Sequence, residues 1–114
     1  MHELAITENI VATVTQRVPG ARVTGVRLEI GQLSGVVADS VRFCFDLVTE
    51  GTALEGAGLE IAEPPGRCRC RDCGVEFAPD WPILLCGCGS ADVQVIAGQD
   101  LVITAVEVAG SEVR

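Results

Sequence analysis

The chain has 114 residues, enough for one modest core, and a composition of 48% hydrophobic and 21% charged residues excludes a disordered protein. The net charge of −8 argues against nucleic acid as a partner, because binding to phosphate backbones requires a basic surface. Apolar runs are too short for a membrane span or a signal peptide, so we expect a cytoplasmic protein with no membrane partner.

The first half of the chain is predicted to contain two helices and a strand. Apolar residues at helical spacing predict an amphipathic helix from Leu4 to Val18, which Pro19 ends. From Val26 to Ile30 apolar and charged side chains alternate, as they do in a half-buried strand. A second helix is predicted from about Asp39, which can cap it, to Val48.

The second half is predicted to place a cysteine-rich segment between strands. Leu59–Ala62 has the alternation of a short strand, and the prolines that follow end it. Residues 67–90 then contain five of the six cysteines. Two β-rich runs follow at Val93–Ala97 and Leu101–Val108, and the last should pair with the strands that precede the cysteines.

Together these elements predict an α+β fold, a small sheet with two helices on one face plus an inserted zinc-ribbon lobe. The main domain would be discontinuous and comprise residues 1–66 together with 93–114. The lobe would comprise residues 67–92. It is too small to hold itself together by apolar burial, so we expect a metal to supply its stability.

The cysteine spacing predicts that metal to be zinc. In a reducing compartment six cysteines are not expected to form disulfides. Cys70 and Cys73 form one pair, Cys86 and Cys88 a second, and twelve residues separate the two pairs. Two such pairs at hairpin tips bring four thiolates around a tetrahedral ion and leave no open position, which is typical of a structural site.

Other roles for the cysteines stay open at this point. Cys68 is a fifth candidate ligand, since its spacing to Cys70 would let it compete. A thiol oxidoreductase using Cys68, Cys70 and Cys73 is the alternative enzyme, although two cysteine pairs favour zinc over a redox site. Cys44, beside Phe45 in the second predicted helix, is expected to be a small core residue.

His2 is the only histidine, and it directly follows the first residue of the chain. At the start of a helix it could be an ordinary exposed side chain. A terminal amine at Met1, the next amide nitrogen and the imidazole can nevertheless chelate one ion in a plane, which suits Ni²⁺ or Cu²⁺. Glu3 could add an amide nitrogen or its carboxylate. Because histidine is large, we expect Met1 to escape removal by methionine aminopeptidase.

Several motifs in this order resemble those of the HypA family of hydrogenase nickel-incorporation proteins, which are nickel metallochaperones. The matching segments are Met1-His2-Glu3, Ile30-Gly31-Gln32-Leu33-Ser34, Cys70-Arg71-Asp72-Cys73-Gly74, Cys86-Gly87-Cys88-Gly89-Ser90 and Gly98-Gln99-Asp100-Leu101. The likeness covers nearly the whole chain. Two departures are the second cysteine pair, which usually reads CxxC in the family, and Asp100, where a glutamate is usual.

The resemblance implies two metal sites and a function. Nickel would bind at His2 with the Met1 amine and neighbouring backbone nitrogens, including Glu3. Structural zinc would bind at Cys70, Cys73, Cys86 and Cys88. The chain would then be a nickel carrier rather than an enzyme, a monomer or weak homodimer that works with the GTPase HypB to load the large subunit of a nickel–iron hydrogenase. The alternative is a zinc-ribbon adaptor or regulator without a nickel function.

Overall fold

The computed structural model describes residues 2–80 and 82–110 and divides the chain into two compact units. The first unit comprises Met1–Leu28, Val36–Ile61 and Val102–Arg114, and the second comprises Glu29–Gly35 and Ala62–Leu101. The described residues form two three-stranded sheets, and each unit is built around one of them. No helix among these residues is long and apolar enough to cross a bilayer.

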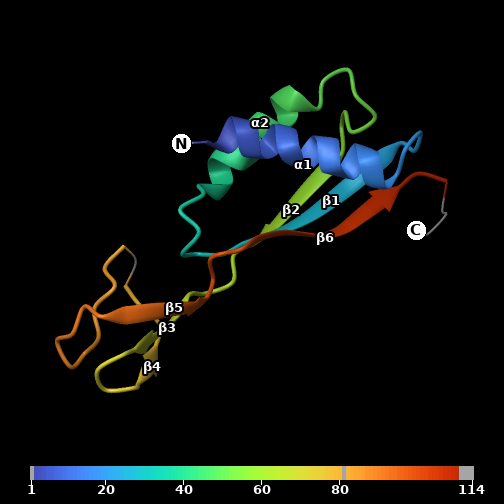
Figure 1. The fold of residues 1–114 in the computed structure, drawn as a ribbon. Helices are drawn as coiled ribbons and strands as arrows, with labels where there is room; N and C mark the ends of the chain where they lie inside the picture. The colour runs from blue at the N-terminus through green and yellow to red at the C-terminus, as the bar shows by residue number, and fades with distance from the viewer. Residues whose placement is uncertain (1, 81, 111–114) are drawn as a thin grey trace. The chain divides into compact units, whose positions relative to one another are not determined.

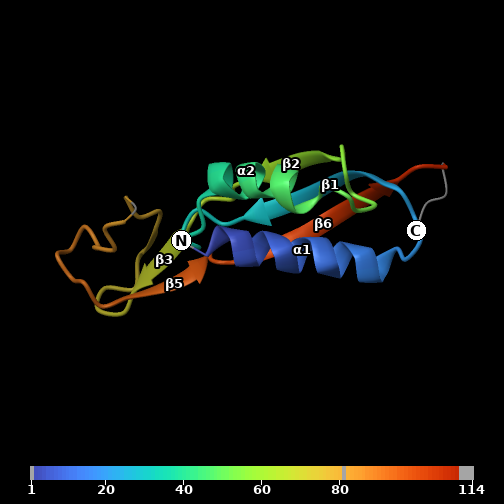
Figure 2. The same cartoon turned by 90° about the horizontal axis from the view of Figure 1, so that it is seen from above.

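The first unit is a sheet with both helices on one face, as predicted (Figure 1). Its elements are α1 (Glu3–Arg17), β1 (Val23–Ile30), α2 (Ala38–Val48), β2 (Gly58–Ala62) and β6 (Leu101–Val108). The strand order is β2-β1-β6. The arrows of β1 and β2 point the same way in Figure 2 and that of β6 points the opposite way. Helix α2 is therefore the crossover that two parallel strands require.

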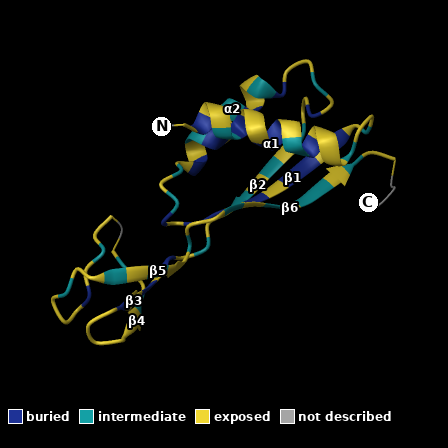
Figure 3. Cartoon of the chain, viewed as in Figure 1, coloured by how far each residue is buried: buried dark blue, intermediate teal, exposed yellow. Residues whose placement is uncertain are grey.

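The core of this unit lies between the helices and the central strand, where Figure 3 shows buried positions on both. Strand β1 buries every position except Thr24, Arg27 and Glu29. The buried hydrophobic residues of the unit are Ile10, Val11, Val14, Val23, Val26, Leu28, Ala38, Val41, Phe45 and Leu54. Because the central strand has a neighbour on each side and helices above it, it is the most deeply buried element.

Two sequence predictions for α2 need correction. The residue that precedes the helix as its N-cap is Val37, not Asp39, and it makes no side-chain cap hydrogen bond. Asp39 instead lies exposed in the first turn, where its carboxylate accepts a hydrogen bond of 2.6 Å from Arg42. Cys44 is half-buried rather than a full core residue, because it lies beside the buried face that Val41 and Phe45 occupy.

The second unit is an antiparallel sheet of β3 (Arg67–Cys70), β4 (Glu76–Phe77) and β5 (Val93–Ala97), in the order β4-β3-β5. Cys68 lies opposite Phe77 on one neighbouring strand and Val95 on the other. The sequence prediction placed residues 93–97 in the main domain, whereas they pair here with the cysteine-bearing strand. Backbone hydrogen bonds between β5 and β3 place β5 in the sheet of the second unit. The alternation of residues within β5 predicts a strand but does not predict which strand it pairs with.

Three glycines let backbone segments of the second unit pack directly against each other. The Gly31 amide donates to the Asp100 carbonyl at 2.9 Å, and the Leu33 amide donates to the Gly98 carbonyl at 2.7 Å. A Cβ atom on Gly31 would lie 2.1 Å from the Gly98 oxygen. Gly98 has a φ of +91°, and a Cβ there would lie 2.6 Å from the Cα atom of Gly66. No side chain fits at Gly31 or Gly98, and a Cβ atom on Gly66 would lie 2.3 Å from the Leu33 side chain. We call Gly31, Gly66 and Gly98 the glycine crossing.

Candidate metal sites

The first cysteine pair lies where β3 ends and the chain turns back toward β4. The Gly74 amide donates to the Cys70 carbonyl at 2.9 Å, and the Cys73 amide points at the Cys70 sulfur at 3.4 Å. Gly74 has a φ of +80°, a conformation that glycine adopts without steric cost. This turn therefore presents both sulfurs and places an N–H group against one of them, as in many metal-binding loops.

The second pair repeats this arrangement with one residue fewer. The Gly89 amide donates to the Cys86 carbonyl at 2.9 Å, and the Cys88 amide points at the Cys86 sulfur at 3.5 Å. Gly89 has a φ of +97°, whereas Gly87 does not have a positive φ. A CxC pair thus presents its two sulfurs in a turn similar to that of the CxxC pair.

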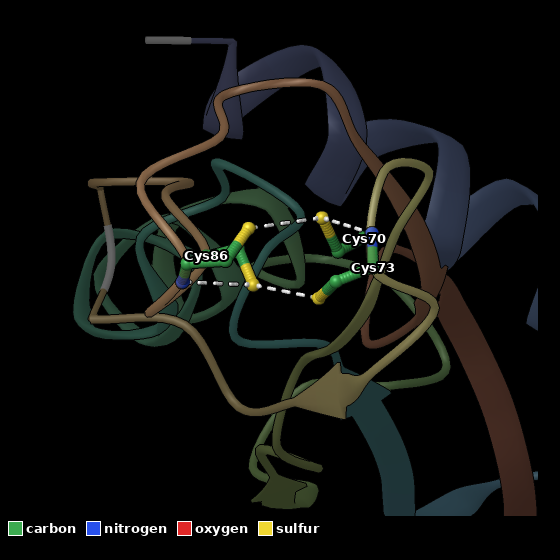
Figure 4. A group of neighbouring side chains, drawn as sticks. Cys70, Cys73 and Cys86 are labelled. Carbon is green, nitrogen blue, oxygen red and sulfur yellow. Dashed lines mark hydrogen bonds between the residues drawn. The ribbon is translucent and has the colours of Figure 1, made fainter.

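The two turns bring the four sulfurs into one cluster, and Figure 4 shows the Cys70, Cys73 and Cys86 side chains converging. The Sγ atoms of Cys70 and Cys88 are 3.7 Å apart, those of Cys73 and Cys86 are 3.6 Å apart, and all four lie within 4.8 Å of one another. Zinc–sulfur bonds of about 2.3 Å place the sulfurs of a tetrahedral site about 3.8 Å apart. The spacing therefore fits a tetrahedral ion and is far from a disulfide bond of about 2.0 Å.

The thiols of this cluster have very different proton affinities. The Cys73 amide, with the Asp72 amide and the neighbouring thiols, lowers the pKa of Cys70 to about 6 against the effect of burial. The Cys88 amide lowers the pKa of Cys86, but burial and the adjacent thiols outweigh it and raise that pKa to about 12. Without a cation the cluster therefore cannot hold four thiolates at neutral pH. A divalent ion would neutralise the charge that keeps the last proton bound.

We expect zinc affinity to fall as pH falls, for a reason that follows from these pKa directions. At neutral pH Cys86 and Cys88 carry protons that zinc must displace, because the pKa of each thiol is raised, that of Cys86 to about 12. Below about pH 6, the pKa of Cys70, one further proton competes and the dependence should steepen. Competition with a chromophoric chelator at successive pH values would measure it. An affinity that stayed constant with pH would contradict thiolate ligation.

Cys68 lies outside the cluster, although it was a candidate ligand. It is fully buried in β3, two residues before Cys70, and so its side chain is on the same face of the strand. Among the described residues the group that could hold an ion contains Cys70 and not Cys68. In this arrangement Cys68 packs within the sheet, opposite Phe77 and Val95.

The arginines around the cysteine turns are paired with carboxylates. Arg69 donates to Glu76, and Arg67 lies 3.7 Å from the same carboxylate. Arg69 first, and Arg67 after it, lowers the pKa of the Glu76 carboxyl. Arg71 makes a 3.0 Å ion pair with Asp92. These pairs neutralise the positive charge of the unit locally, and that is unfavourable for binding a phosphate backbone.

The predicted amino-terminal site is described only from residue 2 onward, since Met1 lies outside the described residues. His2 is exposed and is the N-cap of α1. Glu3 is the first residue of the helix, and only 7% of it is exposed. Its carboxylate accepts a 3.0 Å hydrogen bond from the Val37 amide at the start of α2. No local sequence pattern predicts this contact, because Glu3 and Val37 are 34 residues apart.

The fold and the cysteine cluster define a class of protein, a small α+β metal-binding protein whose cysteine unit resembles a zinc ribbon. Comparison with known proteins then gives the family. The family model described as "Hydrogenase/urease nickel incorporation, metallochaperone, hypA" matches residues 1–108. The chain belongs to the HypA family.

Curated relatives agree with this assignment. The chain is 53% identical over 108 residues to the hydrogenase maturation factor HypA of Nostoc punctiforme, a match that covers 95% of this chain and 96% of the relative. It is 46% identical over 109 residues to the HypA of Geotalea uraniireducens, with 95% and 99% covered.

Solved structures support the fold. The solution structure of the Ni metallochaperone HypA from Helicobacter pylori matches with a TM-score of 0.64 at 20% identity, covering 95% of this chain and 97% of that one. A second HypA solution structure matches with a TM-score of 0.66 at 20% identity, covering 97% and 98%. At this level of identity the likeness concerns the fold alone.

Proposed function

We propose that this chain is a nickel metallochaperone that delivers Ni(II) for the maturation of a nickel–iron hydrogenase and carries a separate structural zinc site. The observation that carries the proposal is the match of residues 1–108 to a family described by nickel incorporation. The segment Met1-His2-Glu3 lies within that match. Nickel is cargo in this proposal, so its site must both bind the ion and release it.

The proposed nickel site is the amino terminus of a chain that begins at Met1. The terminal amine, the amide nitrogens that follow and the His2 imidazole would supply nitrogen donors in one plane, a geometry suited to Ni²⁺. His2 is exposed, which supports transfer of the ion to a partner.

The proposed zinc site is the cluster of Cys70, Cys73, Cys86 and Cys88. Four thiolates would complete the coordination of zinc, and a complete shell leaves no position for water or substrate. The ion would therefore have a structural role, holding together the two turns that carry the cysteines. The separation of this site from His2 in the sequence, and its different donor atoms, supports two ions with two roles.

We further propose that the chain acts with the GTPase HypB and the hydrogenase large subunit, in the cytoplasm and without catalysing a reaction. Family membership supports a place in the maturation machinery. The family description also names urease, so experiment must identify the enzyme that receives nickel.

We expect nickel affinity to depend on the free terminal amine and on the imidazole. Replacing His2 with alanine, or adding a short Gly-Ser extension before Met1, removes one donor from the plane and should weaken nickel binding by at least about tenfold, equivalent to about 1.4 kcal/mol. Calorimetric titration of untagged protein would measure it. Zinc content, determined in the same samples, should not change. Unchanged nickel affinity in both variants would refute the proposed site.

A second candidate function, a zinc-ribbon interaction adaptor without nickel, is favoured by one observation. Val75, Ile83 and Leu85 are large apolar side chains exposed in the second unit. Exposed apolar side chains near a zinc site can contact another protein. This candidate predicts that the unmodified chain takes up no nickel at neutral pH, which the same titration decides.

A further inference from the structure

Glu3 has a side-chain environment that its proposed place in a nickel site does not explain. A carboxylate at the exposed end of a helix is ordinarily solvated, yet Glu3 is only 7% exposed. Its Oε2 atom accepts the Val37 amide hydrogen at 3.0 Å, across 34 residues of sequence. Burying a carboxylate is costly unless it is hydrogen-bonded, and this contact is one of those that compensate for its burial.

The contact also meets a requirement of α2. The residue preceding that helix is Val37, which has no side-chain acceptor of its own, and the first N–H groups of a helix need one. The amino end of a helix also favours a negative charge. A carboxylate supplied by α1 therefore accepts the N–H of the N-cap residue of α2, the donor that a glutamate at the third helical position accepts in a capping box.

The backbone around Glu3 is held as well. The Ile6 amide donates to the His2 carbonyl at 2.9 Å, and the buried Thr7 hydroxyl donates to the Glu3 carbonyl at 2.6 Å. The first turn of α1 is thus fixed through both the main chain and the Glu3 side chain. His2, the residue directly before it, is exposed.

We propose that Glu3 is a positioning residue for nickel and not a carboxylate ligand. Its side chain ties the first turn of α1 to the start of α2, and this anchor holds the turn that begins directly after His2. The inference deepens the proposed function and rests on it. Of the two donors that Glu3 offers, the backbone nitrogen stays available to the ion, because drawing the carboxylate away would leave the Val37 amide, at the start of α2, without this acceptor.

Anchoring at residue 3 has a measurable consequence. A metal held by the proposed amino-terminal nitrogen donors restrains the same turn that the Glu3 carboxylate restrains, so each should favour the other by the same factor. Nickel binding should therefore slow hydrogen exchange of the Val37 amide. Loss of the anchor should weaken nickel binding without changing the donor atoms.

Substitution of Glu3 separates the two roles. Glu3→Gln keeps an oxygen that can accept the Val37 amide hydrogen but removes the carboxylate, whereas Glu3→Ala removes both. If Glu3 positions the site, Glu3→Gln retains nickel affinity, and Glu3→Ala weakens it by about 10- to 100-fold, the usual effect of losing a group that orients metal ligands. Nickel X-ray absorption and d–d spectra should be the same in all forms. Glu8→Gln, which removes an exposed charge from the same helix, is the control.

The contrary results are equally distinct. A nickel spectrum that changes in Glu3→Gln, with lower affinity, makes the carboxylate a ligand and overturns the inference. Unchanged affinity and Val37 exchange in Glu3→Ala overturn it as well. The exchange rate of Val37 is measured without metal, so the anchor is tested even in protein that takes up no nickel. If the protein takes up no nickel, the proposed function fails and the positioning role fails with it. A changed nickel spectrum in Glu3→Gln refutes the positioning role alone.

Discussion

Replacing Cys70 with alanine is expected to abolish zinc binding and to unfold the cysteine turns of the second unit. Three remaining sulfurs leave the tetrahedral shell incomplete, and structural zinc contributes on the order of 10 kcal/mol of apparent binding free energy in small domains. The short strands β3 and β4 cannot replace that contribution, since β4 has only two residues. Metal analysis of the purified variant and amide exchange across residues 67–97 would measure both effects.

Cys68 provides a matched control for this experiment. It lies in the same strand and is as deeply buried as Cys70, with 0% and 1% exposed, but it lies outside the sulfur cluster. Cys68→Ala should therefore retain zinc and lose only the packing of one sulfur atom. Zinc lost from Cys68→Ala, or retained in Cys70→Ala, would show that Cys68 is a ligand and would require a different donor set.

Replacing Gly31 with alanine is expected to lower the free energy of unfolding by at least about 3 kcal/mol, at the upper end of overpacking effects. The added Cβ atom would lie 2.1 Å from the Gly98 oxygen and 2.9 Å from the Gln99 nitrogen, and both are backbone atoms. Backbone atoms cannot move aside as a flexible side chain does, so the glycine crossing must open. That opening would break the hydrogen bonds from the Gly31 and Leu33 amides.

Gly58 is a suitable control, because its φ is not positive and a Cβ atom there would meet only the Thr24 oxygen, at 3.9 Å. Gly58→Ala should be neutral or slightly stabilising, since it restricts the unfolded chain. Denaturant unfolding of both variants would test the comparison. Equal stabilities for Gly31→Ala and Gly58→Ala would mean that the segments at the crossing are not in close contact.

The predicted helices and the fold class follow from local patterns. Apolar residues at a spacing of three and four make α1 and α2 amphipathic, and alternation makes β1 a strand, because each pattern gives one element a face to bury. The family could likewise be predicted, since the motifs and their order along the chain can be read from the sequence without a structure. The spacing of Cys70, Cys73, Cys86 and Cys88 marked the same four residues that the structure groups.

Other features depend on atoms that meet only after the chain has folded. The pairing of β5 with β3 depends on backbone hydrogen bonds, which every residue type except proline can both donate and accept, so no residue pattern reveals it. The need for glycine at Gly31 depends on the Gly98 carbonyl, 67 residues later. The Glu3 carboxylate faces Val37, although its place next to His2 suggested a metal. Helices and strands can be predicted because their periodicity involves residues close together in the sequence. These contacts cannot, because they depend on where backbone groups distant in the sequence lie after folding.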